Sequence, residues 1–146
     1  MKKWISLFAL LLFLSGCSLL EDVNNTLDYV NEATDYVNEA NQFANDVPAL
    51  AEQAASDPNV LANLEEQLQM MQEEIQEFNA LNPPGIAEDI HQTIEGYNQT
   101  IEAAIDSSLE KIEQGQFQLN ELMDSELMQT FQNLQNTLNQ LEQLGN

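Results

Sequence analysis

Positive charge is almost absent from this sequence. Its 146 residues include 25 Asp and Glu but only three basic residues, Lys2, Lys3 and Lys111, which gives a formal net charge of −22. Proteins that bind the phosphate backbone of a nucleic acid use Lys and Arg to displace its counterions. The composition therefore excludes a nucleic-acid-binding protein of that kind.

Cysteine and histidine each occur only once. The single cysteine, Cys17, excludes an intramolecular disulfide and a CxxC zinc site. Glu88 and His91 have the Glu-x-x-His spacing of di-iron helix bundles, but such a site needs this motif twice. Because the chain has no second histidine, we expect His91 to be a surface or half-buried residue.

Motifs of the common enzyme classes are also missing. The sequence contains no EF-hand loop, no Gly-rich phosphate-binding loop and no Gly-x-Ser-x-Gly motif. Carboxylates such as Glu73 and Glu74 occur mainly on polar helix faces, where they stay solvated and ionised, whereas a catalytic acid needs burial to shift its pKa. We therefore expect no enzymatic activity, no cofactor and no small-molecule substrate.

The N-terminal residues form a targeting segment. Lys2 and Lys3 precede an apolar run from Trp4 to Leu14 that only Ser6 interrupts. Such a run makes roughly 16 Å of helix, which is too short to cross a hydrocarbon core of about 30 Å. The run predicts the hydrophobic part of a signal peptide rather than a transmembrane helix.

Four residues after this run carry a specific signal. Leu14-Ser15-Gly16-Cys17 resembles the bacterial lipobox, Leu-(Ser/Ala)-(Gly/Ala)-Cys. The resemblance implies cleavage of residues 1–16 as a lipoprotein signal peptide and a diacylglyceryl group on the Cys17 sulfur. It further implies acylation of the new amino group, so that Cys17 becomes an S-diacylglycerol and N-palmitoyl cysteine. The alternatives are an ordinary secretory signal or an inert buried thiol.

The lipobox also predicts where the protein lies. The resemblance implies a protein that is lipid-anchored to the cell membrane on its extracytoplasmic face, because two or more acyl chains bind a bilayer stably. Residues 17–22 then comprise the lipidated cysteine and a short tether, and residues 23–146 form a single helical domain. Ser18 is not the Asp-type retention signal of Gram-negative lipoproteins. The sequence resembles small helical lipoproteins of Gram-positive, Bacillus-like bacteria, many without assigned function.

The first predicted helix, from about residue 20 to 47, contains a repeat of seven. Residues 28–34 (DYVNEAT) are followed by residues 35–41 (DYVNEAN). A heptad repeat predicts an apolar seam that packs on a partner helix. Three aromatic residues lie beside this seam, and we expect them to pack in it or in the core rather than to form a platform for a ligand. The seam residues are Val23, Val30, Val37 and Ala44 at one position and Thr26, Ala33, Ala40 and Val47 at the other. The flanking aromatic residues are Tyr29, Tyr36 and Phe43.

Prolines divide the rest of the chain into further helices. Pro48 is expected to end the first helix, before a short Ala-rich turn. Asp57 and Pro58 predict the start of a second helix as N-cap and first residue, and residues 82–85 (NPPG) stop it. Isoleucines from residue 86 onward predict a third. Asp124 caps a fourth helix, unless residues 86–144 form one long bent helix. The apolar residues of the second helix recur at intervals of three and four: Leu61, Leu64, Leu68, Met71, Ile75 and Phe78.

These patterns predict the fold class. Each long segment has one apolar stripe and one polar face, and the apolar stripes must be buried against one another. An all-α bundle of three to four long amphipathic helices, with coiled-coil-like pairing, satisfies this requirement.

One side of the third helix is acidic. Like charges at i, i+4 destabilise a helix by about 0.2–0.5 kcal/mol per pair, so this many acids on one face call for an explanation. The face either keeps the protein soluble or is a weak cation-binding surface. Its metal-site candidates are Glu102, Asp106 and Glu110. The whole acidic stripe comprises Glu88, His91, Glu95, Glu102, Asp106, Glu110 and Glu113.

The sequence predicts the cellular location of the protein more clearly than its function. We expect a membrane-anchored surface lipoprotein that acts as a non-enzymatic interaction or structural module of the cell envelope. Its partners would be the membrane and an envelope or secreted protein. The alternative is an acidic binding module for cationic ligands such as Ca²⁺, polyamines or basic peptides.

Overall fold

The structure is a computed structural model that describes residues 17–118, 122 and 125–144. It contains four long helices and, within these ranges, no strand, which confirms the all-α bundle that the sequence predicts. The signal peptide and Asp124 lie outside the described residues. The helices are α2 (Cys17–Ala54), α3 (Pro58–Asn79), α4 (Glu88–Glu113) and α6 (Ser125–Leu144).

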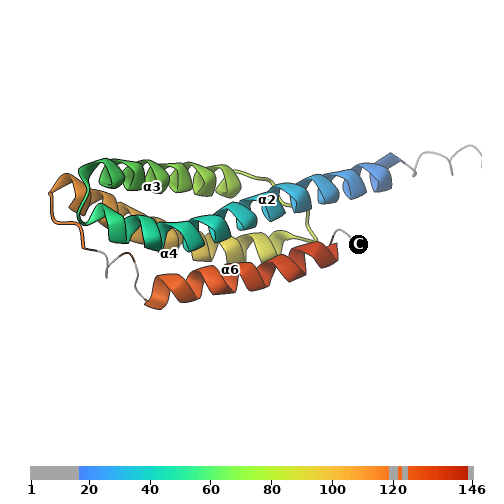
Figure 1. The fold of residues 1–146 in the computed structure, drawn as a ribbon. Coiled ribbons are helices and arrows are strands. Elements are labelled where there is room, and N and C mark those ends of the chain that lie inside the picture. Colours follow the sequence, from blue (N-terminus) through green and yellow to red (C-terminus); the bar gives the residue numbers. More distant parts are fainter. Residues whose placement is uncertain (1–16, 119–121, 123–124, 145–146) are drawn as a thin grey trace, which may run out of the picture.

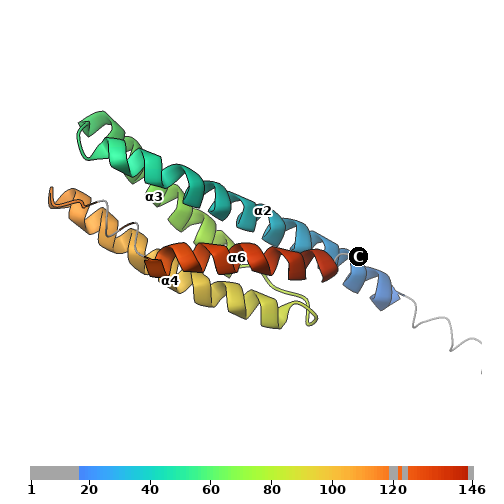
Figure 2. The same ribbon diagram turned by 60° about the horizontal axis from the view of Figure 1, so that its bottom comes forward.

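The helices run up and down around one core. Helix α2 packs against α3 and α6, and α4 packs against the same two helices, so α2 and α4 are diagonal partners. Figures 1 and 2 show the α3–α4 connection, the C-terminal part of α6 and the first half of α2 at one end of the bundle, which we call the loop end. The first turns of α2 project beyond this end.

Helix α2 is longer than the sequence predicts. It begins at Cys17 rather than near residue 20 and continues through Pro48 to Ala54. A proline inside a helix removes one backbone hydrogen bond and clashes with the preceding turn. The turn around Pro48 nevertheless buries Val47 and Ala51 in the core, and this burial offsets the cost of the proline. The expected tether, residues 17–22, is likewise helical.

Helix α3 matches its prediction. Asp57 is the N-cap, and its side chain accepts a hydrogen bond of 2.9 Å from the backbone N–H of Asn59, while Pro58 is the first helical residue. The helix ends at Asn79, just before residues 82–85. Leu61 is only partly buried against the core. The other predicted apolar residues are all buried: Leu64, Leu68, Met71, Ile75 and Phe78.

Gly115 separates α4 from the rest of the chain. It adopts a left-handed φ of 65°. The N–H of Gln116 donates to the carbonyl of Lys111 at 2.8 Å, and the N–H of Gly115 donates to that of Ile112 at 3.0 Å. These two bonds form a Schellman motif. The alternative of one long helix over residues 86–144 is therefore wrong.

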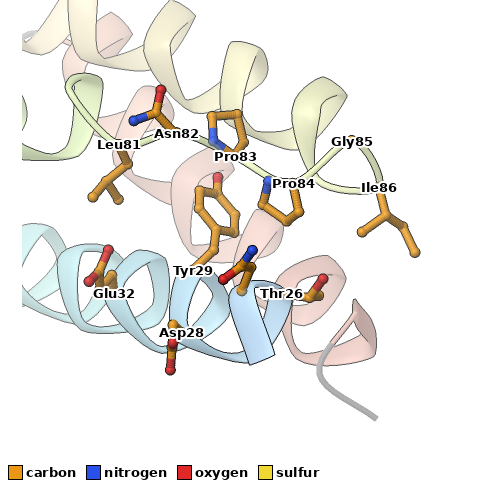
Figure 3. Close-up of a pocket in the computed structure, with 11 residues that line it drawn as sticks. Thr26, Asp28, Tyr29, Glu32, Leu81, Asn82, Pro83, Pro84, Gly85 and Ile86 are labelled. Atoms are coloured by element: carbon orange, nitrogen blue, oxygen red, sulfur yellow. The ribbon is translucent and has the colours of Figure 1, made fainter. Parts of the chain in front are cut away.

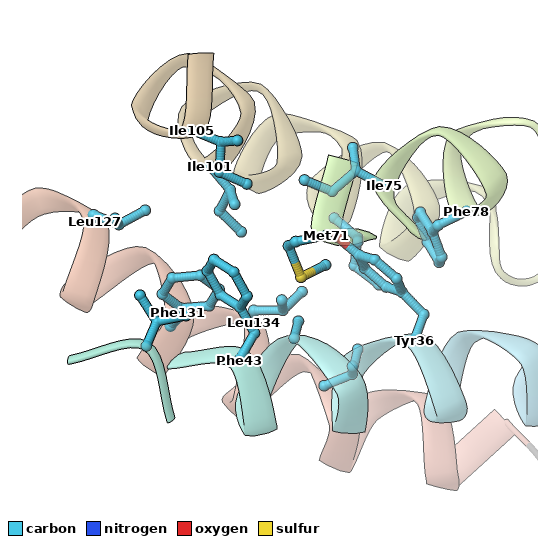
Figure 4. Close-up of a cluster of buried hydrophobic side chains, with 14 of the residues drawn as sticks. Tyr36, Phe43, Met71, Ile75, Phe78, Ile101, Ile105, Leu127, Phe131 and Leu134 are labelled. Carbon is cyan, nitrogen blue, oxygen red and sulfur yellow. The ribbon is translucent and has the colours of Figure 1, made fainter. Parts of the chain in front are cut away.

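The aromatic residues of α2 lie in the core together with most of the predicted seam, as expected. Tyr36, Phe43 and the apolar residues of the other three helices point toward one another in Figure 4. Tyr36 stacks on Phe78 with ring centroids 4.5 Å apart, and Phe43 contacts Phe131 at 5.9 Å. The predicted seam position of Ala44 is only partly buried. The seam residues Ala33, Val37 and Ala40 are fully buried, so seam and aromatic residues form one core face.

Candidate functional site

Two hydrogen bonds connect the diagonal helices α2 and α4 through the core. The Tyr29 hydroxyl and Nδ1 of His91 lie 3.1 Å apart, and the Tyr36 hydroxyl donates to Oδ1 of Asn98. Both pairs span 62 residues of sequence. The two tyrosines are seven residues apart in α2, and His91 and Asn98 are seven residues apart in α4. Because the two helices run in the same direction, both hydrogen-bonded pairs stay aligned along them. We call these four residues the polar ladder.

His91 lies inside the core, and the expectation of a surface or half-buried histidine is wrong. Its exposed fraction is 5%. The imidazole stacks on Phe78 with centroids 4.8 Å apart and tilts against Tyr29 at 5.8 Å. Burial lowers the pKa of His91, and Glu95, whose Oε1 lies 3.6 Å from Nε2, opposes this only in part. The ring is therefore neutral at pH 7.

The tautomer of His91 follows from its two neighbours. The carboxylate of Glu95 can only accept a hydrogen bond, so the imidazole proton belongs on Nε2, which faces it. Nδ1 is then an acceptor, and the Tyr29 hydroxyl donates to it. Burial and the charge of Glu95 raise the pKa of Tyr29 to about 12, which keeps this hydroxyl protonated.

Asn98 forms the second rung. Its side chain is fully buried, and its Nδ2 donates to Oδ1 of Asn79 on α3 at 2.8 Å. Burial also raises the pKa of Tyr36 well above its usual range, so this residue is a neutral donor too. Within the described residues, no buried side-chain N or O atom lacks a hydrogen-bond partner. The ladder is therefore internally satisfied.

A cleft at the loop end adjoins the first rung. It has a volume of about 670 Å³, and Figure 3 shows Tyr29 between the first turns of α2 and the α3–α4 connection. Ile86 in this connection is 65% exposed, because α4 begins at Glu88 rather than at residue 86 as predicted. The lining is Asn25, Thr26, Asp28, Tyr29, Glu32 and residues 81–86.

The acidic stripe of α4 does not converge on one point. Asp106 accepts a hydrogen bond from Gln72 Nε2 at 2.5 Å, and Glu110 accepts one from Gln114 Nε2 at 2.9 Å, whereas Glu102 is partly buried. In the ranges that the structure covers, no three His, Cys, Asp or Glu side chains gather closely enough to hold a metal ion. The structure therefore does not bring these three candidates together at one point.

A different acidic contact lies between α2 and α3. The carboxyl group of Glu74 is hydrogen-bonded to that of Glu39, and this bond, partial burial and the charges of Glu39, Glu77 and Glu73 raise the pKa of Glu74 to about 7. Sequence reasoning treated these acids as solvated. Nothing in the spacing of residues within one helix indicates a contact between two helices.

The polar ladder was also missed, although the sequence carries a signal for it. His91 and Asn98 are seven residues apart and lie on the isoleucine stripe of α4, beside Ile94 and Ile101. Tyr29 and Tyr36 have the same spacing in the repeat. Two polar residues at heptad spacing within an apolar stripe indicate a buried pair that needs partners. Chemically, the ladder supplies fixed hydrogen bonds and one imidazole that can take up a proton.

Comparisons with known proteins agree with the sequence resemblance. Residues 29–144 match the family described as "Family of unknown function (DUF6376)". The "Uncharacterized lipoprotein YybP" of Bacillus subtilis (strain 168) is 38% identical over 135 residues, which cover 92% of this chain and 91% of the relative. No solved structure matches the chain. No helix in the described ranges has the length and apolar character needed to cross a membrane. The chain therefore belongs to the DUF6376 family, and its resemblance to the small lipoproteins of Bacillus-like bacteria is confirmed.

Proposed function

We propose that the protein is a non-enzymatic interaction or structural module that a lipid on Cys17 holds at the extracytoplasmic face of the cell membrane. The observation that carries this proposal is that Cys17 belongs to α2 itself. The same helix supplies the core residues Tyr36 and Phe43. An anchor at this position is therefore continuous with the folded domain.

The length of the projecting segment supports an upright arrangement. From Cys17 to Tyr29, the first rung of the ladder, a helix rises roughly 18 Å at 1.5 Å per residue. The bundle would then stand above the lipid headgroups, with its loop end toward the membrane and the α2–α3 turn away from it. Such an arrangement presents the outer faces of the bundle to other envelope or secreted proteins.

The anchor is tested by mass and by accessibility. The purified protein should have the mass of a chain that begins at Cys17 and carries acyl groups, and protease added to intact protoplasts should digest it. Cys17→Ala should leave an uncleaved precursor without diacylglycerol, whereas Ser18→Ala, the matched control, should be processed normally. An unmodified Cys17 thiol in the wild-type protein would refute the anchor.

The interaction role needs a separate test. A photo-crosslinking amino acid is placed in living cells at one exposed position of α3 and one of α4, Gln76 and Ser107. A single protein adduct from one face that is lost in Cys17→Ala supports the proposal. The same adducts from both faces, or none from either, would contradict a specific partner.

The alternative, an acidic module for cationic ligands, is favoured by the contact between Glu39 and Glu74. The pKa of Glu74 is raised to about 7 by this contact, by burial and by the charges of Glu39, Glu77 and Glu73, so acidic side chains gather between α2 and α3. Melting curves in CaCl₂ and MgCl₂ at matched ionic strength distinguish the two functions. Screening alone predicts equal stabilisation by both ions, whereas a binding site predicts a saturable, ion-selective rise. Glu39→Gln combined with Glu74→Gln should abolish such a rise.

A further inference from the structure

We propose that Tyr29, His91 and Glu95 form an acid-operated latch at the loop end. With a neutral imidazole the latch ties α4 to α2, and uptake of one proton by His91 loosens this end while the rest of the bundle stays folded. This device would give the protein a response to the pH outside the membrane, and it does not depend on the identity of a partner.

The geometry of the hydrogen bond makes the latch sensitive to a proton. Nδ1 of His91 lies 3.1 Å from the Tyr29 hydroxyl and is the acceptor of its proton. A proton from solvent binds the same lone pair of Nδ1, and both ring nitrogens are then donors. The Tyr29 hydroxyl can then no longer donate to Nδ1 and can only accept from it, so the hydrogen bond must reverse, and a positive charge arises in a position that is only 5% exposed.

The groups around His91 provide one opposite charge. Helix α4 contributes Glu95, helix α2 presents the phenol of Tyr29, and helix α3 presents the ring of Phe78. Among the charged side chains of the described residues, only Glu95 raises the pKa of His91. Its Oε1 is 3.6 Å from Nε2, which is longer than a good charge-assisted hydrogen bond. Burial outweighs it, so protonation of His91 costs stability.

The loosening is confined to the loop end for two reasons. Tyr29, the partner of His91, lines the cleft of about 670 Å³, so water in the cleft can reach the first rung when it loosens. The next rung, Tyr36 with Asn98, contains an amide, which does not titrate, and a phenol whose pKa is raised by burial. Acid therefore acts on the first rung and leaves the second rung intact.

The chain offers direct reporters for this proposal. His91 is the only histidine, so its imidazole NMR signals in the full-length protein in detergent micelles are unambiguous. The amides of Ala87 and His91 donate to the carbonyls of Pro84 and Ala87 at 2.8 and 2.9 Å, and their exchange protection reports the loop end. The amides of Ile101 and Ile105 report the centre of α4.

The experiment follows the imidazole and the amides from pH 8 to pH 4. We expect His91 to titrate below its ordinary 6.5, and the protection factors of Ala87 and His91 to fall at the same midpoint while those of Ile101 and Ile105 hold. Glu95→Gln should lower the midpoint and shift the loss of protection with it. Tyr29→Phe should reduce protection of Ala87 and His91 already at pH 7.

The matched control is His91→Gln, because its amide oxygen can still accept from Tyr29 but does not titrate in this range. Its loop end should stay protected down to pH 4. A His91 midpoint at or above 6.5, or an equal loss of protection in His91→Gln, would overturn the proposal. Loss of protection at Ile101 with the same midpoint would also overturn it, because that result describes global unfolding.

Discussion

The carboxyl group of Glu74 on α3 is hydrogen-bonded to that of Glu39 on α2, across the interface between the two helices. The pKa of Glu74 rises from its ordinary value of 4.5 to about 7, first because of this bond and second because of burial. The folded state thus binds the proton more tightly than the unfolded state. The stabilisation is fully present below about pH 4.5 and is lost as the pH rises to about 7.

Glu74→Gln should therefore remove a pH-dependent cost. At pH 8 we expect the variant to be more stable than the wild type by about 1 kcal/mol, a modest value because the pair is partly exposed. At pH 5 the difference should nearly vanish. Urea unfolding at both pH values measures it, with Glu66→Gln on the exposed face of α3 as control. An advantage of the same size at both pH values would contradict the raised pKa of Glu74.

Tyr36→Phe should test the second rung of the polar ladder. The substitution keeps the stack on Phe78 but leaves Oδ1 of the fully buried Asn98 without its donor. An unsatisfied buried acceptor costs about 1–3 kcal/mol. Urea unfolding measures the loss, and a double-mutant cycle with Asn98→Ala should give a coupling energy of at least about 0.5 kcal/mol. Tyr97→Phe, at a half-buried position of α4, should change stability less.

Ile101→Ala should show how much the bundle depends on its centre. Ile101 is fully buried between the helices, and its truncation leaves a cavity that costs about 2–5 kcal/mol. Ile86 is the matched control, since it is 65% exposed in the α3–α4 connection. Ile86→Ala should change the free energy of unfolding by less than about 0.5 kcal/mol. Equal losses would mean that the connection is packed in solution.

Replacing two of the glycines by alanine should change the stability of the protein in opposite directions. Gly115→Ala places a Cβ at a φ of 65°, and the left-handed conformation costs about 1–2 kcal/mol for other residues. Gly96 lies inside α4, and a Cβ there meets nothing within 4 Å. Gly96→Ala should therefore stabilise by about 1 kcal/mol through helix propensity. Thermal melts of both variants check the pair, and a loss of stability in Gly96→Ala would indicate that a partner packs on this side.

Local signals in the sequence were sufficient for much of the fold. The start of α3 at Asp57 and Pro58 and its stripe from Leu64 to Phe78 follow from capping and from heptad spacing, which act within one helix. The end of α2 did not follow. Propensity alone ends a helix at Pro48, whereas burial of neighbouring residues against other helices keeps it intact.

The candidate site was harder to predict because its residues break the rule of polar outside and apolar inside. His91 and Asn98 are buried only because Tyr29 and Tyr36 reach them from the opposite helix. Such partners are 62 residues apart in sequence, and no pattern within one segment identifies them. The raised pKa of Glu74 depends in the same way on its contact with Glu39 across α2 and α3.

Because the heptads of α2 are nearly identical, α2 could align with α4 in more than one way, and a single hydroxyl selects one alignment. If α2 slid by one repeat along α4, Tyr36 would replace Tyr29 opposite His91, and most other contacts would recur. Phe43 would then face Asn98, and a buried amide oxygen without a donor would cost about 1–3 kcal/mol. A slide the other way would place the Tyr36 hydroxyl against Ile105. The oxygen atom that distinguishes Tyr36 from Phe43 therefore selects one alignment of the repeat, as polar residues do in coiled coils.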